Sequence, residues 1–151
     1  MPQIIQAETA EHVEILRQLF REYANSLDTD LCFQSFEEEL RRLPENYTGL
    51  YLALEGETPA GCAGLRRLSD NAGELKRLYV RPAYRGLGLG RQLVQAAIEN
   101  ARQLGYERLR LDTLPSMTRA LQLYRSLGFT PIAAYDRNPV PDATFWELNL
   151  R

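Results

Sequence analysis

The sequence predicts an α+β fold in a single domain, because the spacing of hydrophobic residues changes repeatedly between a helical and an alternating pattern. The 151 residues are 44% hydrophobic and 25% charged, a composition typical of one globular domain. Segments with alternating spacing (β) and with helical spacing (α) follow one another in the order β-α-α-β-β-β-α-β-α-β-β, without an internal repeat. We therefore expect residues 1–151 to form one domain.

The first half of the chain predicts two helices and four strands. Thr9 is the expected N-cap of a first helix, whose apolar residues recur at helical spacing. A shorter helix is expected over residues 35–43, with Ser35 as its N-cap and Glu38 as the capping-box partner. Segments rich in alternating apolar residues predict strands at 3–7, 50–54, 60–68 and 74–80.

The second half predicts two more helices and three strands. A glycine-rich turn opens a helix over residues 88–104, and Gly105 ends its apolar stripe. Alternation of leucine with charged residues predicts a strand at 108–113. Another helix is expected over 116–127, before Gly128. Two last strands are expected around a loop with turn-forming residues, at 130–135 and 144–150.

The composition excludes several classes of protein. A formal net charge of -2 gives no basic excess, so no nucleic-acid partner is expected. No apolar run reaches membrane-spanning length and no signal peptide is visible, so no membrane partner is expected. Cys32 and Cys62 are too few for a metal site or a disulfide framework. We therefore expect a cytoplasmic protein that binds no metal.

The most specific local signal is the segment Arg85-Gly86-Leu87-Gly88-Leu89-Gly90, between an expected strand and an expected helix. Glycine lets the backbone approach a ligand closely, and free N–H groups at a helix N-terminus bind phosphate. A P-loop would need Lys and then Ser or Thr after the last glycine, whereas Arg91 follows here. A dinucleotide-binding fingerprint stays open, because Asp112 resembles its ribose-binding acid. A turn that only packs the helix against the strand also stays open.

Three segments together resemble the GNAT N-acetyltransferase superfamily. The glycine-rich segment matches the R/Q-x-x-G-x-G/A loop that binds acyl-CoA in that family. Residues 74–82 are similar to the strand before this loop, and residues 120–129 to the family's A-x-x-L-Y-x-x-x-G-F helix. The resemblance implies a mixed, mostly antiparallel central sheet flanked by helices. It also implies that acetyl-CoA binds between the strands at 74–80 and 108–113.

The resemblance further implies which residues bind the acetyl donor. In the family, a β-bulge in the strand before the loop frees backbone N–H groups for the pantetheine arm and the thioester oxygen. The adjacent Lys76 and Arg77 break clean alternation here, as a bulge does. Many family members have Asn where this chain has Met117, which cannot make the same hydrogen bond to the cofactor arm. The residues expected to bind acetyl-CoA are Leu78, Tyr79, Val80, Arg85, Gly86, Leu87, Gly88, Leu89, Gly90, Arg91 and Tyr124.

Two catalytic residues follow from the same resemblance. Glu74 lies where histone acetyltransferases of the superfamily carry their base, although other members lack a carboxylate there. A surface or ion-paired glutamate next to Lys76 and Arg77 is the alternative, and Asp112 or a chain of waters is a second route for the proton. Tyr124 matches the family tyrosine whose phenol protonates or hydrogen-bonds the CoA sulfur. Its place on the apolar face of a helix also fits a core residue.

The implied function is transfer of an acetyl group from acetyl-CoA directly to a primary amine of a small molecule or to an exposed amino group. The alternative is a non-catalytic acyl-CoA-binding regulatory domain, against which the presence of both Glu74 and Tyr124 argues. A homodimer is expected by analogy, through apolar surface of the C-terminal strands around Phe145 and Trp146. The residues expected to line the acceptor site are Asp28, Asp30, Tyr135, Asp136, Arg137 and Asp142.

Overall fold

A computed structural model describes residues 2–27, 34–114, 117–135 and 142–151 of the chain. Its elements follow the expected order, with one short 3-10 turn added before the third helix. The strands are β1 (Pro2–Gln6), β2 (Gly49–Glu55), β3 (Thr58–Ser69), β4 (Ala72–Val80), β5 (Arg108–Thr113), β6 (Thr130–Ile132) and β7 (Thr144–Asn149). The helices are α1 (Ala10–Ser26), α2 (Gln34–Arg41), α3 (Leu89–Gln103) and α4 (Thr118–Ser126), and the 3-10 turn is η1 (Pro82–Tyr84).

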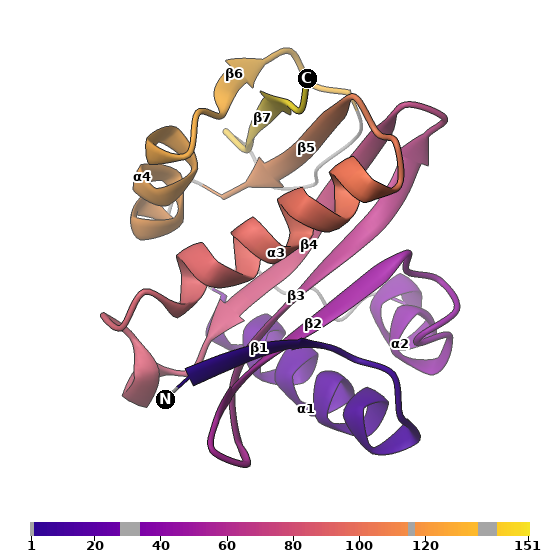
Figure 1. The fold of residues 1–151 in the computed structure, drawn as a ribbon, viewed down its shortest axis with the longest axis vertical. Helices are drawn as coiled ribbons and strands as arrows, with labels where there is room; N and C mark the ends of the chain where they lie inside the picture. Colours follow the sequence, from indigo (N-terminus) through magenta and orange to yellow (C-terminus); the bar gives the residue numbers. More distant parts are fainter. Residues whose placement is uncertain (1, 28–33, 115–116, 136–141) are drawn as a thin grey trace.

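The described strands form one seven-stranded sheet in the order β1-β2-β3-β4-β5-β7-β6. Neighbouring strands are antiparallel except β4 and β5, which run parallel. The α3 helix forms the crossover that this parallel pair requires. The expected α+β fold with a mixed, mostly antiparallel sheet is therefore confirmed (Figure 1).

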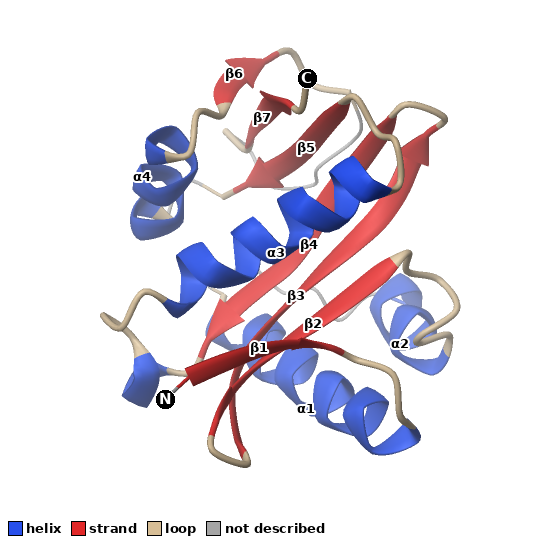
Figure 2. Cartoon of the chain, in the orientation of Figure 1, coloured by secondary structure: helices blue, strands red, loops and turns tan. Residues whose placement is uncertain are grey.

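Helices cover both faces of the sheet (Figure 2). Leu93 of α3 packs in a core on one face, and Phe20 of α1 packs with Leu40 of α2 near the other. Because successive residues of a strand point to opposite faces, the neighbours Leu52 and Ala53 of β2 belong to different cores. In the part of the chain that the structure describes, no helix has the length and apolar character needed to cross a membrane.

The helix starts confirm one expected cap and correct another. The Thr9 hydroxyl accepts a hydrogen bond from the His12 backbone N–H at 3.1 Å, and His12 Nδ1 accepts one from the Thr9 N–H at 3.4 Å. The α2 helix already includes Gln34, so Ser35 is not its N-cap. A Ser-x-x-Glu pattern marks a helix start only where the backbone of the serine is non-helical, and the pattern alone does not reveal that conformation.

A β-bulge interrupts β4 where the adjacent cationic side chains predict one. The pairing register between β3 and β4 shifts there, so that Ala63 of β3 lies opposite both Arg77 and Leu78. Arg77 has a φ of 60°, a left-handed conformation that is uncommon for a residue with a side chain. The bulge therefore rests on a backbone conformation that the rest of the structure has to hold in place.

The strands β4 and β5 separate soon after they start. They pair only over Ala72–Glu74 and Arg108–Arg110, although β4 continues to Val80 and β5 to Thr113. The edges of the two strands beyond this short ladder therefore face a gap in the sheet. The resemblance to acyl-CoA-binding folds implies such a gap.

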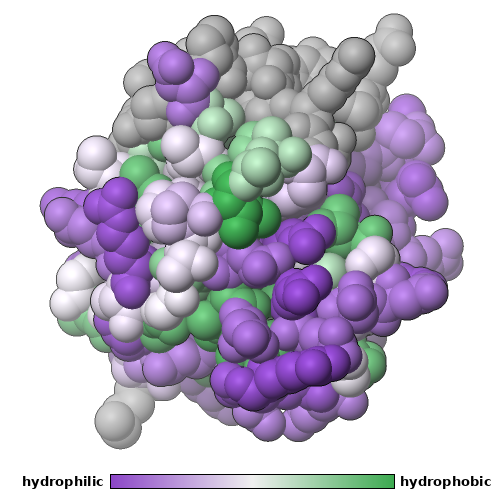
Figure 3. Space-filling view, turned by 90° about the horizontal axis from the view of Figure 1, so that it is seen from above, coloured by the Kyte–Doolittle hydropathy of each residue, from purple (hydrophilic) through white to green (hydrophobic). Residues whose placement is uncertain are grey.

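The C-terminal strands do not offer the apolar surface expected for a dimer. Phe145 and Trp146 are only 7% and 5% exposed. Phe145 packs against Tyr135 with ring centroids 5.1 Å apart, and Trp146 joins the core beneath α3. Phe145 and Trp146 are successive residues of β7, so their side chains point to opposite faces of the sheet, and each is buried on its own face. Figure 3, which looks onto the β6–β7 end of the molecule, shows hydrophilic residues around a small group of hydrophobic ones near the centre of this face.

Candidate active site

The glycine-rich loop leads from β4 through η1 into α3. Gly86 and Gly88 have φ angles of 82° and 81°, which residues with side chains rarely adopt. A Cβ atom built on either glycine meets no atom within 4 Å, so the loop presents an open backbone rather than a packed turn. Gly88 is also the N-cap of α3, whose first N–H groups have no acceptor within the helix. This combination fits an anionic ligand such as a diphosphate.

The free edge of β4 faces the gap between β4 and β5. The Arg81 N–H donates to the Ala60 carbonyl of β3 at 2.8 Å. Because consecutive backbone groups of a strand point to opposite edges, the Val80 N–H and carbonyl point away from β3 and toward the gap. The Val80 carbonyl accepts a hydrogen bond there from Arg85 Nε at 3.1 Å. The Val80 N–H is therefore directed at an extended ligand that would lie beside β4 like an added strand.

A pocket of about 770 Å³ opens beside this edge. It is lined by the end of β4, the glycine-rich loop, the first turn of α4 and the C-terminal end of α1. Two of the expected cofactor-binding residues, Leu87 and Tyr124, are not among its lining residues, and Leu87 is 56% exposed. The expected residues that do line the pocket are Leu78, Tyr79, Val80, Arg85, Gly86, Gly88, Leu89, Gly90 and Arg91, together with Met117.

The pocket also contains residues that the motifs do not single out. Tyr23 reaches it from α1 and Arg119 from α4. With Arg85 and Arg91, Arg119 makes three arginines among the lining residues, which suits a ligand with several phosphates. The amphipathic pattern of α1 predicts that Tyr23 lies on its buried face, but no signal in the sequence shows that this face meets the glycine-rich loop.

Tyr124 lies in α4, with a side chain that is 6% exposed and packed against Phe129 at 5.6 Å between ring centroids. Burial raises the pKa of the Tyr124 phenol, and the nearby Tyr23 and Asp112 raise it further. The phenol therefore stays protonated at neutral pH, as a proton donor must. Its packing in the core beneath α3 also matches the alternative reading as a core tyrosine.

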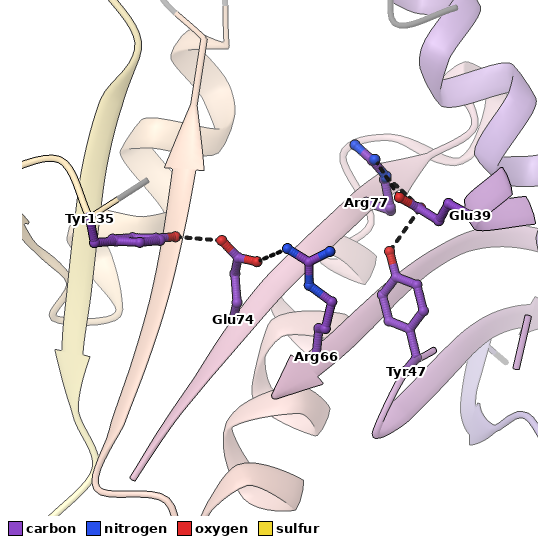
Figure 4. Close-up of polar contacts among 6 residues, drawn as sticks. All are labelled: Glu39, Tyr47, Arg66, Glu74, Arg77 and Tyr135. Atoms are coloured by element: carbon purple, nitrogen blue, oxygen red, sulfur yellow. Dashed lines mark hydrogen bonds and ion pairs between the residues drawn. The ribbon is translucent and has the colours of Figure 1, made fainter. Parts of the chain in front are cut away.

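Glu74 is 2% exposed and both of its carboxylate oxygens have partners (Figure 4). Arg66 Nη2 donates to Oε1 at 2.7 Å, and the Tyr135 hydroxyl donates to Oε2 at 2.7 Å. The expected alternative of an ion-paired glutamate is therefore realised, with Arg66 in place of the neighbouring Lys76 and Arg77. Burial raises the pKa of Tyr135, and the negative charge of Glu74 raises it further, so this phenol also stays neutral.

Asp112 lies on β5 beyond its last pairing with β4. Burial is the main cause that raises the pKa values of Tyr23, Tyr124 and Tyr135, and the negative charge of Asp112 adds to the shift in all three. These tyrosines come from α1, α4 and the segment after β6. Tyrosines from three parts of the chain are therefore near enough to Asp112 for its charge to affect their pKa values.

Several expected residues of the acceptor site lie outside the described part of the chain. These are Asp28, Asp30, Asp136 and Arg137, and Cys32 lies there too. Asp142 is described and is exposed. Cys62 is also described, and burial raises the pKa of its thiol, which disfavours the reactive thiolate. Among residues 2–27, 34–114, 117–135 and 142–151, no group of three His, Cys, Asp or Glu side chains could hold a metal ion.

Comparison with known proteins identifies relatives of the whole domain. A sequence model of the acetyltransferase (GNAT) family matches residues 13–129. An uncharacterized N-acetyltransferase of Schizosaccharomyces pombe is 34% identical over 146 residues, covering 93% of this chain and 90% of that protein. A GNAT-family acetyltransferase structure from Staphylococcus aureus has a TM-score of 0.85 at 22% identity, and each chain is covered to 100%. The structure of a putative acetyltransferase from Salmonella typhimurium with acetyl-CoA has a TM-score of 0.79 at 23% identity, covering 99% of this chain and 94% of that one.

The open loop at the start of α3, the free edge of β4 and the cationic pocket between them define an acyl-CoA-dependent transferase. With the family match over most of its length, the chain belongs to the acetyltransferase (GNAT) family. It is an N-acetyltransferase that uses acetyl-CoA as its acetyl donor. Backbone groups of the loop would hold the diphosphate, and the Val80 edge would hold the pantetheine arm.

Proposed function

We propose that the enzyme transfers the acetyl group directly to a primary amine of a small molecule or to an exposed amino group. The main observation that supports this proposal is the separation of β4 from β5. It leaves the donor edge at Val80 open on one side of the sheet, with Asp112 and its neighbouring tyrosines at the same gap. An amine that enters from the α1–α2 side would meet the thioester there without a covalent enzyme intermediate.

The proposed acid is Tyr124. In direct transfer, the amine nitrogen forms a bond to the thioester carbon and the carbon–sulfur bond breaks, so that a thiolate leaves. The reference pKa of a thiol is about 8.5 and that of a phenol about 10, so the phenol is the weaker acid, and a neutral phenol stabilises the leaving thiolate by a hydrogen bond in which its proton is shared with the sulfur. The pKa of Tyr124, raised by burial, keeps the phenol in the protonated form that this step needs.

The proposed base is Glu74, acting through Tyr135. An alkyl ammonium group has a pKa of about 10, so it has to lose a proton before the nitrogen can attack at neutral pH. Glu74 is enclosed, but the Tyr135 hydroxyl already donates its proton to Glu74 Oε2. The phenol oxygen can accept the proton of the amine while its own proton passes to Glu74. Asp112 and a chain of waters remain the competing route.

The names of two relatives support a small amino compound as the acceptor. A thialysine N-epsilon-acetyltransferase of Bos taurus is 41% identical over 54 residues, which cover 36% of this chain. An N-acetylaspartate synthetase of Xenopus tropicalis is 33% identical over 91 residues, which cover 60% of this chain. Both names describe a small amino compound that is acetylated on nitrogen.

A panel assay tests the proposal. The purified protein is incubated with acetyl-CoA and single amines, peptides with free N-termini or no acceptor, and both free CoA and the acetylated product are measured. We expect equal amounts of CoA and product with at least one amine. CoA binding without product across the panel would favour the non-catalytic regulatory alternative.

We also propose that the enzyme is a cytoplasmic homodimer. The two cysteines and the buried thiol of Cys62 are consistent with a reducing compartment. The dimer rests on analogy alone, and because Phe145 and Trp146 are buried, other surface would have to form the interface. Light scattering at micromolar concentration distinguishes a dimer from a monomer of 17.3 kDa.

A further inference from the structure

An enclosed ion pair joins the bulge of β4 to α2. Arg77 Nε and Nη2 donate to the two carboxylate oxygens of Glu39 at 3.0 and 2.8 Å (Figure 4). The two side chains are only 14% and 12% exposed. The Tyr47 hydroxyl donates to Glu39 Oε2 at 2.9 Å and so fixes the carboxylate from another direction. Two parallel hydrogen bonds of this kind set the orientation of both side chains, which a single point contact does not.

Other contacts hold the same arginine. Its guanidinium carbon lies 5.3 Å from the ring centroid of Phe36 in α2 and 5.9 Å from that of Tyr23 in α1. The Cys62 thiol of β3 donates to the Arg77 carbonyl at 3.4 Å. Side chain and backbone of Arg77 are therefore held by three different elements.

These contacts explain why a left-handed conformation persists at Arg77. A residue with a side chain is disfavoured at positive φ and keeps that conformation only where its surroundings over-determine it. Leu78 and Val80, which line the pocket, follow directly. The conformation of Arg77 therefore decides the direction in which the free edge of β4 leaves the bulge.

We propose that Arg77 is a positioning residue for acetyl transfer: paired with Glu39, it holds the bulge so that the backbone N–H groups after it point at the thioester. This inference rests on the proposed function. The Arg77 guanidinium is bound to Glu39, so Arg77 acts through the backbone and not by touching the cofactor. The diphosphate would bind separately, at the loop of residues 85–91. Loss of the pair should therefore affect the rate of transfer more than the affinity for CoA.

Two single variants test this separation. Glu39→Gln and Arg77→Lys should each lower kcat about tenfold or more, because displacing a reacting geometry by 1 Å can cost about 100-fold. The Kd for CoA, measured by calorimetry, should rise by a much smaller factor than kcat falls, because the loop that would bind the diphosphate is untouched. The control is Glu38→Gln, which breaks an exposed ion pair to Arg41 within the same helix, α2. It leaves the bulge intact, and its kcat should equal that of the unchanged enzyme.

A triple variant separates positioning from stability. Replacement of an enclosed ion pair by apolar side chains of similar size is often neutral for folding. Because the Tyr47 hydroxyl donates to Glu39, Tyr47→Phe has to accompany the change, so that no buried hydroxyl loses its acceptor. Glu39→Met combined with Arg77→Met and Tyr47→Phe should therefore keep a melting temperature near that of the unchanged enzyme and still have the low kcat. An unchanged kcat in this triple variant would overturn the proposal.

Amide hydrogen exchange tests the proposal without turnover. In the CoA complex, exchange at Leu78 and Val80 should be faster in Glu39→Gln than in the unchanged protein, whereas in Glu38→Gln it should be as slow as in the unchanged protein. If no amine is acetylated but this difference in exchange is present, the proposed function fails and the role of the ion pair in fixing the bulge stands. Equal exchange in all three proteins would show that Arg77 does not fix the bulge.

Discussion

At the scale of single residues, Tyr124 and Glu74 serve different proton transfers, so their loss should have different kinetic effects. Tyr124→Phe keeps the ring that packs against Phe129 and removes the acid. We expect kcat to fall by about 100-fold, within the range of general acid catalysis, while acetyl-CoA binding changes little. Steady-state kinetics with the best acceptor measure both quantities. If more than half of the activity is retained, Tyr124 is a core residue only.

Glu74→Gln removes the proposed base while it keeps the shape of the side chain. The rate should drop at neutral pH and recover as rising pH deprotonates the amine in solution, because the free amine then needs no base. Tyr135→Phe removes the proposed relay and should give the same profile, although Glu74 keeps its partner Arg66. The measurement is kcat/KM from pH 6 to pH 9. A Glu74→Gln profile parallel to that of the unchanged enzyme would leave Glu74 with a structural role.

The Arg77–Glu39 ion pair predicts how stability depends on pH. Burial alone would raise the pKa of Glu39, but the hydrogen bonds and charge of Arg77 outweigh it and hold this pKa below its ordinary value of 4.5. A carboxyl with a lowered pKa in the folded state stabilises the protein fully above pH 4.5, and this contribution is lost as pH falls through the lower value.

Urea unfolding should therefore show a constant difference in the free energy of unfolding between the unchanged protein and Glu39→Gln from pH 5 to pH 7. The difference should shrink below about pH 4.5. Glu38→Gln is the matched control, because Glu38 pairs with Arg41 on the exposed side of the same helix. A difference that stays constant down to pH 3 would show that the ion pair does not lower the pKa of Glu39.

At the scale of elements, the loop before α3 makes one substitution diagnostic. Gly88→Val places a β-branched side chain at a φ of 81° and into the open space that the diphosphate would use. CoA binding measured by calorimetry should become undetectable, while circular dichroism still shows a folded protein. Leu104→Ala, at an exposed position at the other end of α3, should bind CoA as before. Retained binding in Gly88→Val would place the diphosphate elsewhere.

The elements that sequence predicts well are those defined by neighbouring residues. The cap at Thr9, the glycines at positive φ and the bulge at Arg77 each depend on local conformational preferences. The contacts that the sequence does not predict join residues far apart in the chain: Arg66 with Glu74 and Tyr135, Arg77 with Glu39, and Tyr23 with the pocket. A charged side chain in the sequence does not show which residue of opposite charge the fold brings beside it.

At the scale of the whole molecule, acetyl-CoA should stabilise the fold, and NAD and ATP should not. A ligand at about 100 times its Kd adds about 2.7 kcal/mol, which raises the melting temperature of a domain of this size by roughly 5 to 10 °C. Thermal scans with each ligand at equal concentration measure the effect. An equal or larger shift with NAD would contradict the assignment of the loop to acyl-CoA.

The strand order also has a consequence for how the molecule folds. Strands β1 to β4 lie in the sheet in the order in which they are synthesised, so this half can form by adding each strand to the previous one. The last described strand, β7, instead inserts between β5 and β6, and it pairs with both. Until residues 144–149 leave the ribosome, β5 and β6 have no partner along those edges, and unpaired edges favour aggregation. A released chain truncated before residue 144 should therefore depend on chaperones more than the chain of residues 1–151.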